Sequence, residues 1–260
     1  MVLKIMKNNL WDLTNQKILI TGATHGIGNA IADGFLRLGA EVFIIARDQG
    51  KLSLLLSTWS KEGYKAHGMI CDVTDANQRH QLIEKIKTQW GELNVLINNV
   101  GPNFKKPFME YSLNEYQTLI DGNMTSTFHL TQLCYPLLAV AKPASIINIS
   151  GISSQKAFTG SGPYGMAKSA VESFTRSLAI ELGDKNIRAN AIVPGFISTP
   201  TFSKKYDEAY LQRAIDKVPL KRLGVGEDIA GLACFLAMPA SSYINGQSII
   251  VDGGFSIYGF

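Results

Sequence analysis

The sequence has few cysteines and places them far apart. Its 260 residues include three, Cys71, Cys134 and Cys234. Their odd number and the lack of a Cys-x-x-Cys pair argue against a disulfide framework and against a zinc site. We therefore expect no metal, and three buried thiols, which is the usual environment of a free cysteine.

Long apolar runs and clustered charges are also missing. No apolar run reaches the roughly 18 residues that suggest a membrane span, and the N-terminal MVLKIMKNNLWDL has too short an apolar stretch for a signal peptide. We expect a cytoplasmic protein with no membrane partner. The net charge of +4 is mildly basic. Because the basic residues form neither a run nor a stripe with aromatic residues, we expect no nucleic acid partner.

The chain consists instead of apolar runs that alternate with segments of helical period. The runs expected as strands are KILI (17–20), EVFIIA (41–46), YKAHGMI (64–70), VLIN (95–98), SIINIS (145–150), RANAIV (188–193) and QSIIVD (247–252). Helices are expected near 27–38, 49–62, 75–89, 112–138, 161–183 and 227–237. This alternation predicts βαβ units. The fold class is then α/β: a single Rossmann-like, doubly wound domain over 1–260, with a seven-stranded parallel sheet and helices on both faces.

A glycine-rich segment follows the first expected strand. ILITGATHGIGNAIA (18–32) places Gly22, Gly26 and Gly28 between a strand end and a helix start. The first two allow a tight turn and a close approach of the backbone to a pyrophosphate, and Gly28 allows the helix to pack on the sheet. The N-terminus of that helix offers unpaired N–H groups to phosphate. We therefore predict a dinucleotide site at this turn.

The spacing Thr-Gly-x-x-x-Gly-x-Gly resembles that of the short-chain dehydrogenase/reductase family, and further motifs extend the resemblance along the chain. They are CDV (71–73), NNVG (98–101), YGMAK (164–168), PGFIST (194–199) and VDGG (251–254). Within the family the chain is most similar to the tropinone-reductase group, including the Gly-Phe at its end. The resemblance implies hydride transfer between a nicotinamide cofactor and a ketone or secondary alcohol. The cofactor-binding residues that it implies are Gly22, Thr24, His25, Gly26, Ile27, Gly28, Asp72, Val73, Asn99, Val100, Gly101, Tyr164, Lys168, Pro194, Gly195, Ile197 and Thr199.

The end of the second expected strand bears on the choice between NAD(H) and NADP(H). An NAD-binding protein usually offers a carboxylate there to the ribose hydroxyls. This chain has Ala46 at that position, followed by Arg47. A guanidinium can hold a 2′-phosphate through charge-assisted hydrogen bonds, so NADP(H) is favoured and Arg47 joins the cofactor-binding set. His25 stands where NADP-specific relatives often carry a second basic residue, although it would help only when protonated.

Tyr164 and Lys168 are the expected catalytic pair. They lie four residues apart on a predicted helix and so share a face. The ordinary pKa of tyrosine is about 10, and a neighbouring ammonium should lower it. A shift to about 7 needs roughly 4 kcal/mol of differential stabilisation. Asn123, on the expected 112–138 helix, matches the proton-relay asparagine that the resemblance implies.

The position of the family's catalytic serine is occupied by Gly151. A missing hydroxyl matters because loss of one hydrogen-bond donor to a developing oxyanion costs about 10²–10³ in rate. Three alternatives follow. Ser153 reaches the site from the loop; or Ser150 does, although strand alternation should point it to the opposite face; or Tyr164 works without a serine.

Three loops should border the substrate pocket: 102–110, 153–163 and 196–218, the last being the candidate lid. Their phenylalanines suggest aromatic walls. The Lys pairs 105–106 and 204–205 either attract an anionic substrate or are solvated loop charges. The phenylalanines concerned are Phe104, Phe108, Phe158, Phe196 and Phe202.

Two classes of function fit these residues. The first is an NADP(H)-dependent carbonyl reductase or alcohol dehydrogenase with a small-molecule substrate. The second is a cofactor-binding relative with little or no turnover, which Gly151 favours. The resemblance further implies a homotetramer that pairs through the 112–138 and 161–183 helices. Both helices carry apolar residues beyond one narrow stripe, as a helix buried on two sides would.

Overall fold

The computed structural model describes residues 9–200, 202 and 206–258. Residues 1–8, the Lys204–Lys205 pair and the terminal Gly-Phe lie outside the described residues. All seven expected strands are present and pair in parallel in the order β3-β2-β1-β4-β5-β6-β7. They are β1 (Lys17–Thr21), β2 (Glu41–Ala46), β3 (Ala66–Ile70), β4 (Val95–Asn98), β5 (Ala144–Ile149), β6 (Ile187–Pro194) and β7 (Ser248–Val251). The doubly wound, seven-stranded α/β fold expected from the sequence is confirmed.

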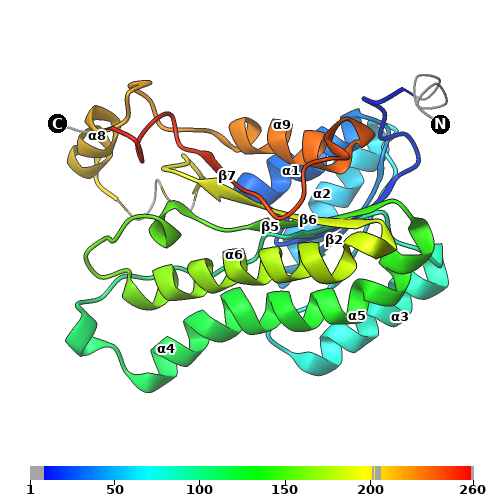
Figure 1. Ribbon diagram of the computed structural model, residues 1–260, viewed down its shortest axis with the longest axis horizontal. Helices are drawn as coiled ribbons and strands as arrows, with labels where there is room; N and C mark the ends of the chain where they lie inside the picture. Colours follow the sequence, from blue (N-terminus) through cyan, green and yellow to red (C-terminus); the bar gives the residue numbers. More distant parts are fainter. Residues whose placement is uncertain (1–8, 201, 203–205, 259–260) are drawn as a thin grey trace.

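Helices cover both faces of this sheet (Figure 1). One core cluster joins the sheet to α1 (Gly26–Arg37), α2 (Gln49–Lys61) and α9 (Gly226–Ala237) through side chains such as Phe35, Leu52 and Ile229. The other face packs on α3 (Ala76–Trp90), α5 (Ser126–Ala141) and α6 (Gly162–Leu182). The strands are buried between these two helix layers. This burial on both faces explains why their sequences are uninterrupted apolar runs.

Two expected segments differ in detail from the structure. The helix expected over 112–138 is α4 (Leu113–Ile120), a π-helical turn at Asp121–Thr125, and α5. The stretch 196–218, expected as a loop, contains the helix α8 (Glu208–Asp216). Asp207 caps α8 by accepting from the backbone N–H of Tyr210 at 2.7 Å, which is the usual role of an aspartate at a helix start.

A chain of buried side-chain amides ties the central strands to the helices beneath them. Asn98 Nδ2 donates to Asn148 Oδ1 at 2.9 Å and to Thr131 Oγ1 at 3.0 Å, and Asn148 Nδ2 donates to Thr175 Oγ1 at 2.8 Å. These bonds fix β4 and β5 against α5 and α6. The carboxyl ends of the two strands are thereby held in place beside α5 and α6.

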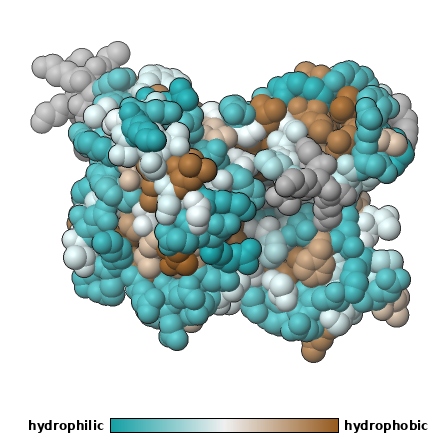
Figure 2. Space-filling model, turned by 180° about the vertical axis from the view of Figure 1, so that it is seen from behind, coloured by the Kyte–Doolittle hydropathy of each residue, from teal (hydrophilic) through white to brown (hydrophobic). Residues whose placement is uncertain are grey.

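The face seen in Figure 2 shows hydrophobic residues in groups among hydrophilic ones. Among the described residues, no helix has the length and apolar composition needed to cross a bilayer. All three cysteines are free and buried.

Candidate active site

The glycine turn between β1 and α1 has the backbone that its sequence predicts. Gly22 and Gly26 have φ angles of +68° and +59°, in the left-handed region that favours glycine. A Cβ at Gly28 would collide with the Gly22 carbonyl oxygen. His25 precedes α1, and its side chain caps no backbone N–H. The first N–H groups of α1 are therefore available to an anion such as a pyrophosphate.

The end of β4 holds this turn in place. Asn99 Nδ2 donates to the carbonyl oxygens of Thr21 and Gly22 at 2.9 and 3.0 Å. Thr21 Oγ1 accepts from the backbone N–H groups of Asn99 and Val100 at 2.9 and 3.1 Å. A Cβ at Gly22 would lie 2.8 Å from the Val100 side chain. The two motifs thus form one cradle, in which the Asn99 amide supports the turn.

Arg47 lies where the sequence predicts a 2′-phosphate contact. It follows β2 directly, and 81% of its side chain is exposed. Its guanidinium lies 3.9 Å from the Asp72 carboxylate at the end of β3. The neighbouring Val73 is buried, and its carbonyl accepts from Arg79. Arg47 and Asp72, which are far apart in sequence, therefore meet at the carboxyl edge of the sheet.

The remaining expected cofactor residues lie around the same edge. Thr24 contacts His25 Nδ1 through its hydroxyl at 3.3 Å. A Cβ at Gly26 would lie 3.1 Å from Thr199 Cγ2, so the 194–199 segment passes directly over the glycine turn. One pocket is lined by Ile27, Asn99, Gly101, Tyr164, Lys168, Pro194, Gly195, Ile197 and Thr199.

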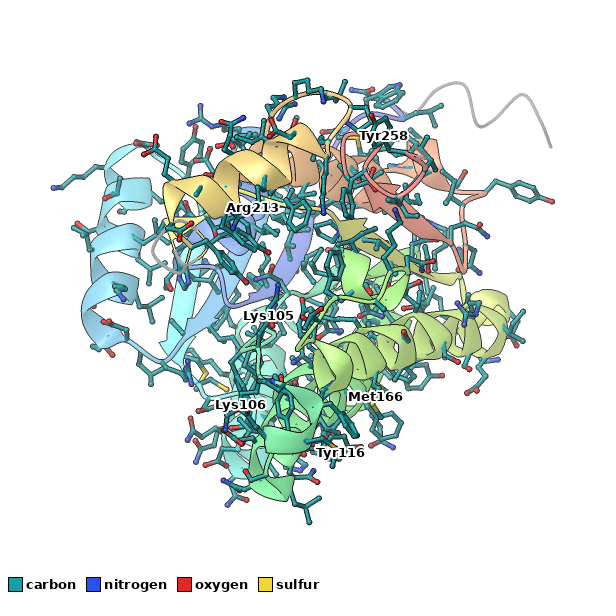
Figure 3. All side chains as sticks on the ribbon, turned by 90° about the vertical axis from the view of Figure 1, so that its left-hand side faces the viewer. Lys105, Lys106, Tyr116, Met166, Arg213 and Tyr258 are labelled. Carbon is teal, nitrogen blue, oxygen red and sulfur yellow. The ribbon has the colours of Figure 1, made fainter. Side chains whose placement is uncertain are left out.

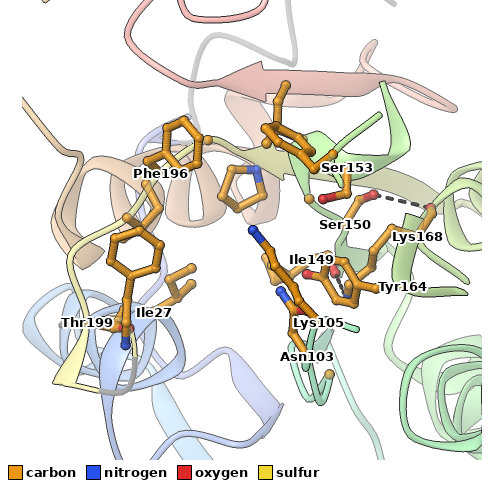
Figure 4. A pocket seen from close by; sticks show the side chains of 18 of the residues that line it. Ile27, Asn103, Lys105, Ile149, Ser150, Ser153, Tyr164, Lys168, Phe196 and Thr199 are labelled. Atoms are coloured by element: carbon orange, nitrogen blue, oxygen red, sulfur yellow. Dashed lines mark hydrogen bonds between the residues drawn. The ribbon is translucent and has the colours of Figure 1, made fainter. Parts of the chain in front are cut away.

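Tyr164 and Lys168 share one face of α6 and both line this pocket (Figure 4). Lys168 Nζ donates to the Ile149 carbonyl at 2.9 Å and lies 5.6 Å from the centroid of the Tyr164 ring. Burial raises the pKa of Tyr164 to about 12 and lowers the pKa of Lys168 to about 8. The pKa of Tyr164 is therefore raised and not lowered as the sequence predicts, because desolvation disfavours the charged forms of both side chains.

Asn123 lies fully buried in the π-helical turn between α4 and α5. Its Nδ2 donates to the carbonyls of Pro102 and Leu119 at 3.0 and 2.9 Å, whereas its Oδ1 has no hydrogen-bond partner among the described residues. A Cβ at Gly101 would meet both Asn123 Oδ1 and Lys168 Nζ. The orphaned oxygen therefore faces the neighbourhood of the lysine, where a bridging water would satisfy it.

Gly151 lies beside the hydroxyl of Tyr164. A Cβ at this position would be 3.0 Å from Tyr164 Oη. The φ of Gly151 is 178°, extended backbone that any residue adopts. The sequence therefore lacks a side chain at a point that faces the Tyr164 hydroxyl, and glycine is not required there by the backbone.

The three nearby serines have different surroundings. The hydroxyls of Ser150 and Ser154 both donate to the buried carboxylate of Glu172, Ser150 at 2.8 Å. Ser153 has no side-chain hydrogen bond within the described part of the chain, and it lines the pocket. Figure 4 shows the Ser153 hydroxyl turned into the pocket and the Ser150 hydroxyl turned toward α6. Of the sequence alternatives, the geometry thus disfavours Ser150 and leaves Ser153 or no serine.

The aromatic wall of the pocket is only partly the expected one. Phe158, Phe196 and Phe202 line it. Phe104 and Phe108 do not. The Phe104 ring packs on Tyr111, with centroids 6.0 Å apart, and Phe108 is 74% exposed in a short 3₁₀ turn.

Sequence reasoning did not single out two tyrosines of the pocket wall. Tyr206 and Tyr210 complete the wall from α8 and the residues before it. The amphipathic pattern after Asp207 could have located Tyr210. Lys105, which the sequence indicated as a candidate contact for an anionic substrate, and Asn103 also line the pocket, from the loop that follows β4. Within the described residues there is no group of three or more His, Cys, Asp or Glu side chains that could hold a metal ion.

Comparisons with known proteins agree on the family. The family model described as "Enoyl-(Acyl carrier protein) reductase" matches residues 22–256. A chloroplastic tropinone reductase homolog of Arabidopsis thaliana is 40% identical over 98% of this chain and 80% of its own. A second tropinone reductase homolog of that plant is 38% identical over 96% of each chain.

Solved structures of dehydrogenases superpose on nearly the whole fold. A putative gluconate dehydrogenase from Agrobacterium tumefaciens has a TM-score of 0.93 at 30% identity, covering 97% of this chain and 100% of its own. A gluconate 5-dehydrogenase from Burkholderia cenocepacia, in complex with NADP and tartrate, has a TM-score of 0.91 at 28% identity. The match covers 96% of this chain and 98% of its own. A 7α-hydroxysteroid dehydrogenase complexed with NADH and 7-oxo glycochenodeoxycholic acid has a TM-score of 0.91 at 31% identity. The match covers 95% of this chain and 96% of its own.

Proposed function

Since this chain belongs to the short-chain dehydrogenase/reductase family, we propose that it is an NADP(H)-dependent carbonyl reductase or alcohol dehydrogenase with Tyr164 as the acid/base. The proposal rests on one observation: the Tyr164 hydroxyl and the Lys168 ammonium line the same pocket as the residues of the glycine cradle. The cradle fits a dinucleotide because its N–H groups are uncapped and Cβ atoms at its glycines would clash. When bound, NADPH would supply hydride to the substrate's carbonyl carbon.

The chain's own residues would move the proton. Tyr164 Oη donates to the carbonyl oxygen as negative charge develops on it, and takes the proton back in alcohol oxidation. Its raised pKa keeps it a phenol at neutral pH, which suits the donor role in reduction. Lys168 and the unpaired Oδ1 of Asn123 would return a proton to the tyrosine through water.

Arg47 supports NADP(H) over NAD(H). Its exposed guanidinium follows β2, where Ala46 replaces the acidic residue that would bind the ribose hydroxyls. The solved relatives include complexes with NADP and with NADH, so the preference comes from this side chain and not from the family. His25, exposed at the start of α1, would add charge only when protonated.

Gly151 favours a second candidate, a cofactor-binding protein with little or no turnover. No hydroxyl extends from the position that faces Tyr164 Oη, and burial raises the pKa of Tyr164 to about 12, which makes it a weak acid.

NADPH and NADH oxidation across a panel of ketones separates the two candidates. We expect NADPH to be consumed with at least one ketone, and faster than NADH. Tight NADPH binding by calorimetry without consumption by any ketone would favour the second candidate.

The wider organisation completes the proposal. We infer one domain over 1–260, with 196–218 as the substrate lid, in a cytoplasmic protein, although one plant relative is named as chloroplastic. We also infer a homotetramer that pairs through α4, α5 and α6. These helices expose large apolar side chains, namely Leu113, Phe128, Tyr135, Met166 and Ile180. A monomer in light scattering at micromolar concentration would contradict this assembly.

A further inference from the structure

Of two adjacent lysines in the loop after β4, Lys105 lines the pocket and Lys106 does not. The amino group of Lys106 bonds the Glu115 carboxylate at 2.7 Å. Lys105 is half-buried, as Lys106 is. Figure 3 shows Lys105 between α8 and the helices below, with Lys106 nearer α4. Figure 4 shows the Lys105 side chain reaching into the pocket from the side of Asn103.

The surroundings of Lys105 are aromatic. Its amino group lies 5.4 to 5.8 Å from the ring centroids of Phe158, Tyr206 and Tyr210. No carboxylate lies within 4 Å of it in the described part of the chain. The hydrogen bond found for it, to Tyr210 Oη, is 3.4 Å long. An ammonium has three donors, so this one still has hydrogen-bonding capacity directed at the pocket.

The charge of the pocket lining has one sign. Its described residues include Lys105 and Lys168 and neither aspartate nor glutamate. Lys168 Nζ already donates to the Ile149 carbonyl and lies beside the Tyr164 ring. Lys105 is therefore the cation left to meet a substrate. A half-buried charge without an opposite charge is a cost in stability, which a ligand carboxylate would offset.

We propose that Lys105 selects ketones that carry a carboxylate remote from the carbonyl, on a flat apolar body that fits between the aromatic walls. The inference deepens the proposed function and rests on it. One ammonium suits a singly charged carboxylate, whereas the fork of an arginine suits a phosphate better. Ketones with a protonated amine at that end are rejected, because two cations would share a site without a counter-ion.

The test uses three aryl ketones of matched shape: acetylbenzoate, its methyl ester and (dimethylaminomethyl)acetophenone. They differ in charge at one end only. For the unaltered protein we expect kcat/KM with NADPH to fall in that order. In Lys105→Met, the ratio of acid to ester should fall about 10- to 100-fold, mainly through KM, the range expected for a hydrogen bond to a charged group. Lys105→Glu should prefer the amine. Lys106→Met is the matched control and should keep the acid-to-ester ratio of kcat/KM that the unaltered protein has.

The outcomes separate this inference from the proposed function. The inference is wrong, and the proposed reductase activity is kept, if ketones are reduced but the acid and the ester have equal kcat/KM. The same holds if Lys105→Met lowers kcat/KM equally for both. If no ketone is reduced, the proposed function fails, and calorimetry of acetylbenzoate binding decides the inference alone. Binding lost in Lys105→Met but kept in Lys106→Met supports it, and equal binding by both variants overturns it.

Discussion

Gly151→Ser should increase turnover, because it adds a hydroxyl beside Tyr164. The backbone there is extended, with φ at 178°, so a side chain causes no backbone strain. The new Cβ would lie 3.0 Å from Tyr164 Oη, so the tyrosine must shift by a few tenths of an ångström. The serine hydroxyl would then lie close enough to the tyrosine to bond the same substrate oxygen.

The expected size of the gain follows from two opposing terms. One oxyanion donor is worth about 2.7–4 kcal/mol in the transition state. The close contact costs about 1–2 kcal/mol, as for a modest overpacking of a core. The difference of about 0.7–3 kcal/mol predicts an increase in kcat of roughly 3- to 160-fold, at about 1.36 kcal/mol for each factor of ten.

NADPH oxidation with a ketone substrate, at saturating cofactor, measures this change. Gly151→Ala is the matched control, since it adds the same carbon without the hydroxyl and should give no gain. Denaturant unfolding of both variants detects any loss of stability. If serine and alanine give the same rate with stability intact, a missing hydroxyl at this position does not limit catalysis. Ser153→Ala then asks whether the loop serine already acts, and a fall in its kcat would show that it does.

Two further predictions concern charged groups. Arg47→Asp should weaken NADPH binding and leave NADH binding equal or better, because it replaces a phosphate partner with a repulsive charge; calorimetry that shows equal losses for both cofactors would rule Arg47 out as the discriminator. For Lys168, burial holds the folded pKa at about 8, below the ordinary 10.5. The unfolded chain therefore binds more protons between these pH values, and stability rises with pH there. Relative to Lys168→Met, the cofactor-free protein should gain up to about 3 kcal/mol of unfolding free energy across that range. A pH-independent difference in denaturant unfolding would show that the lysine is not desolvated.

Sequence patterns predicted the sheet well because parallel strands buried on both faces are continuous apolar runs. The runs 41–46 and 95–98 coincide with β2 and β4. The same patterns missed the π-helical turn at Asp121–Thr125, since a single wide turn inside a long helix leaves the apolar period nearly unchanged. They also missed α8, whose nine residues follow a loop rich in polar residues.

The candidate site could be predicted where a motif determines the backbone conformation. It could not be predicted where the orientation of a loop side chain decides which residue lines the pocket. The backbone of the glycine turn follows from its spacing, and the shared helix face of Tyr164 and Lys168 follows from their separation of four residues. Adjacent residues in a loop have no fixed period, so the sequence could not tell which of Lys105 and Lys106 enters the pocket. Nor could it show that Glu172 engages two of the three serines, because that contact joins α6 to a distant loop.

The central claim is that Tyr164 protonates a carbonyl that receives hydride from NADPH. The most direct test follows transfer of deuterium from NADPH deuterated at the reactive carbon of the nicotinamide into the alcohol product, by mass spectrometry, in the unaltered protein and in Tyr164→Phe. We predict labelled alcohol from the unaltered protein, and at least about 100-fold less from the variant, the lower range of a general acid's contribution. NADPH affinity and stability should be similar in the two proteins. Labelled alcohol formed at equal rates by both proteins would contradict the assignment of Tyr164.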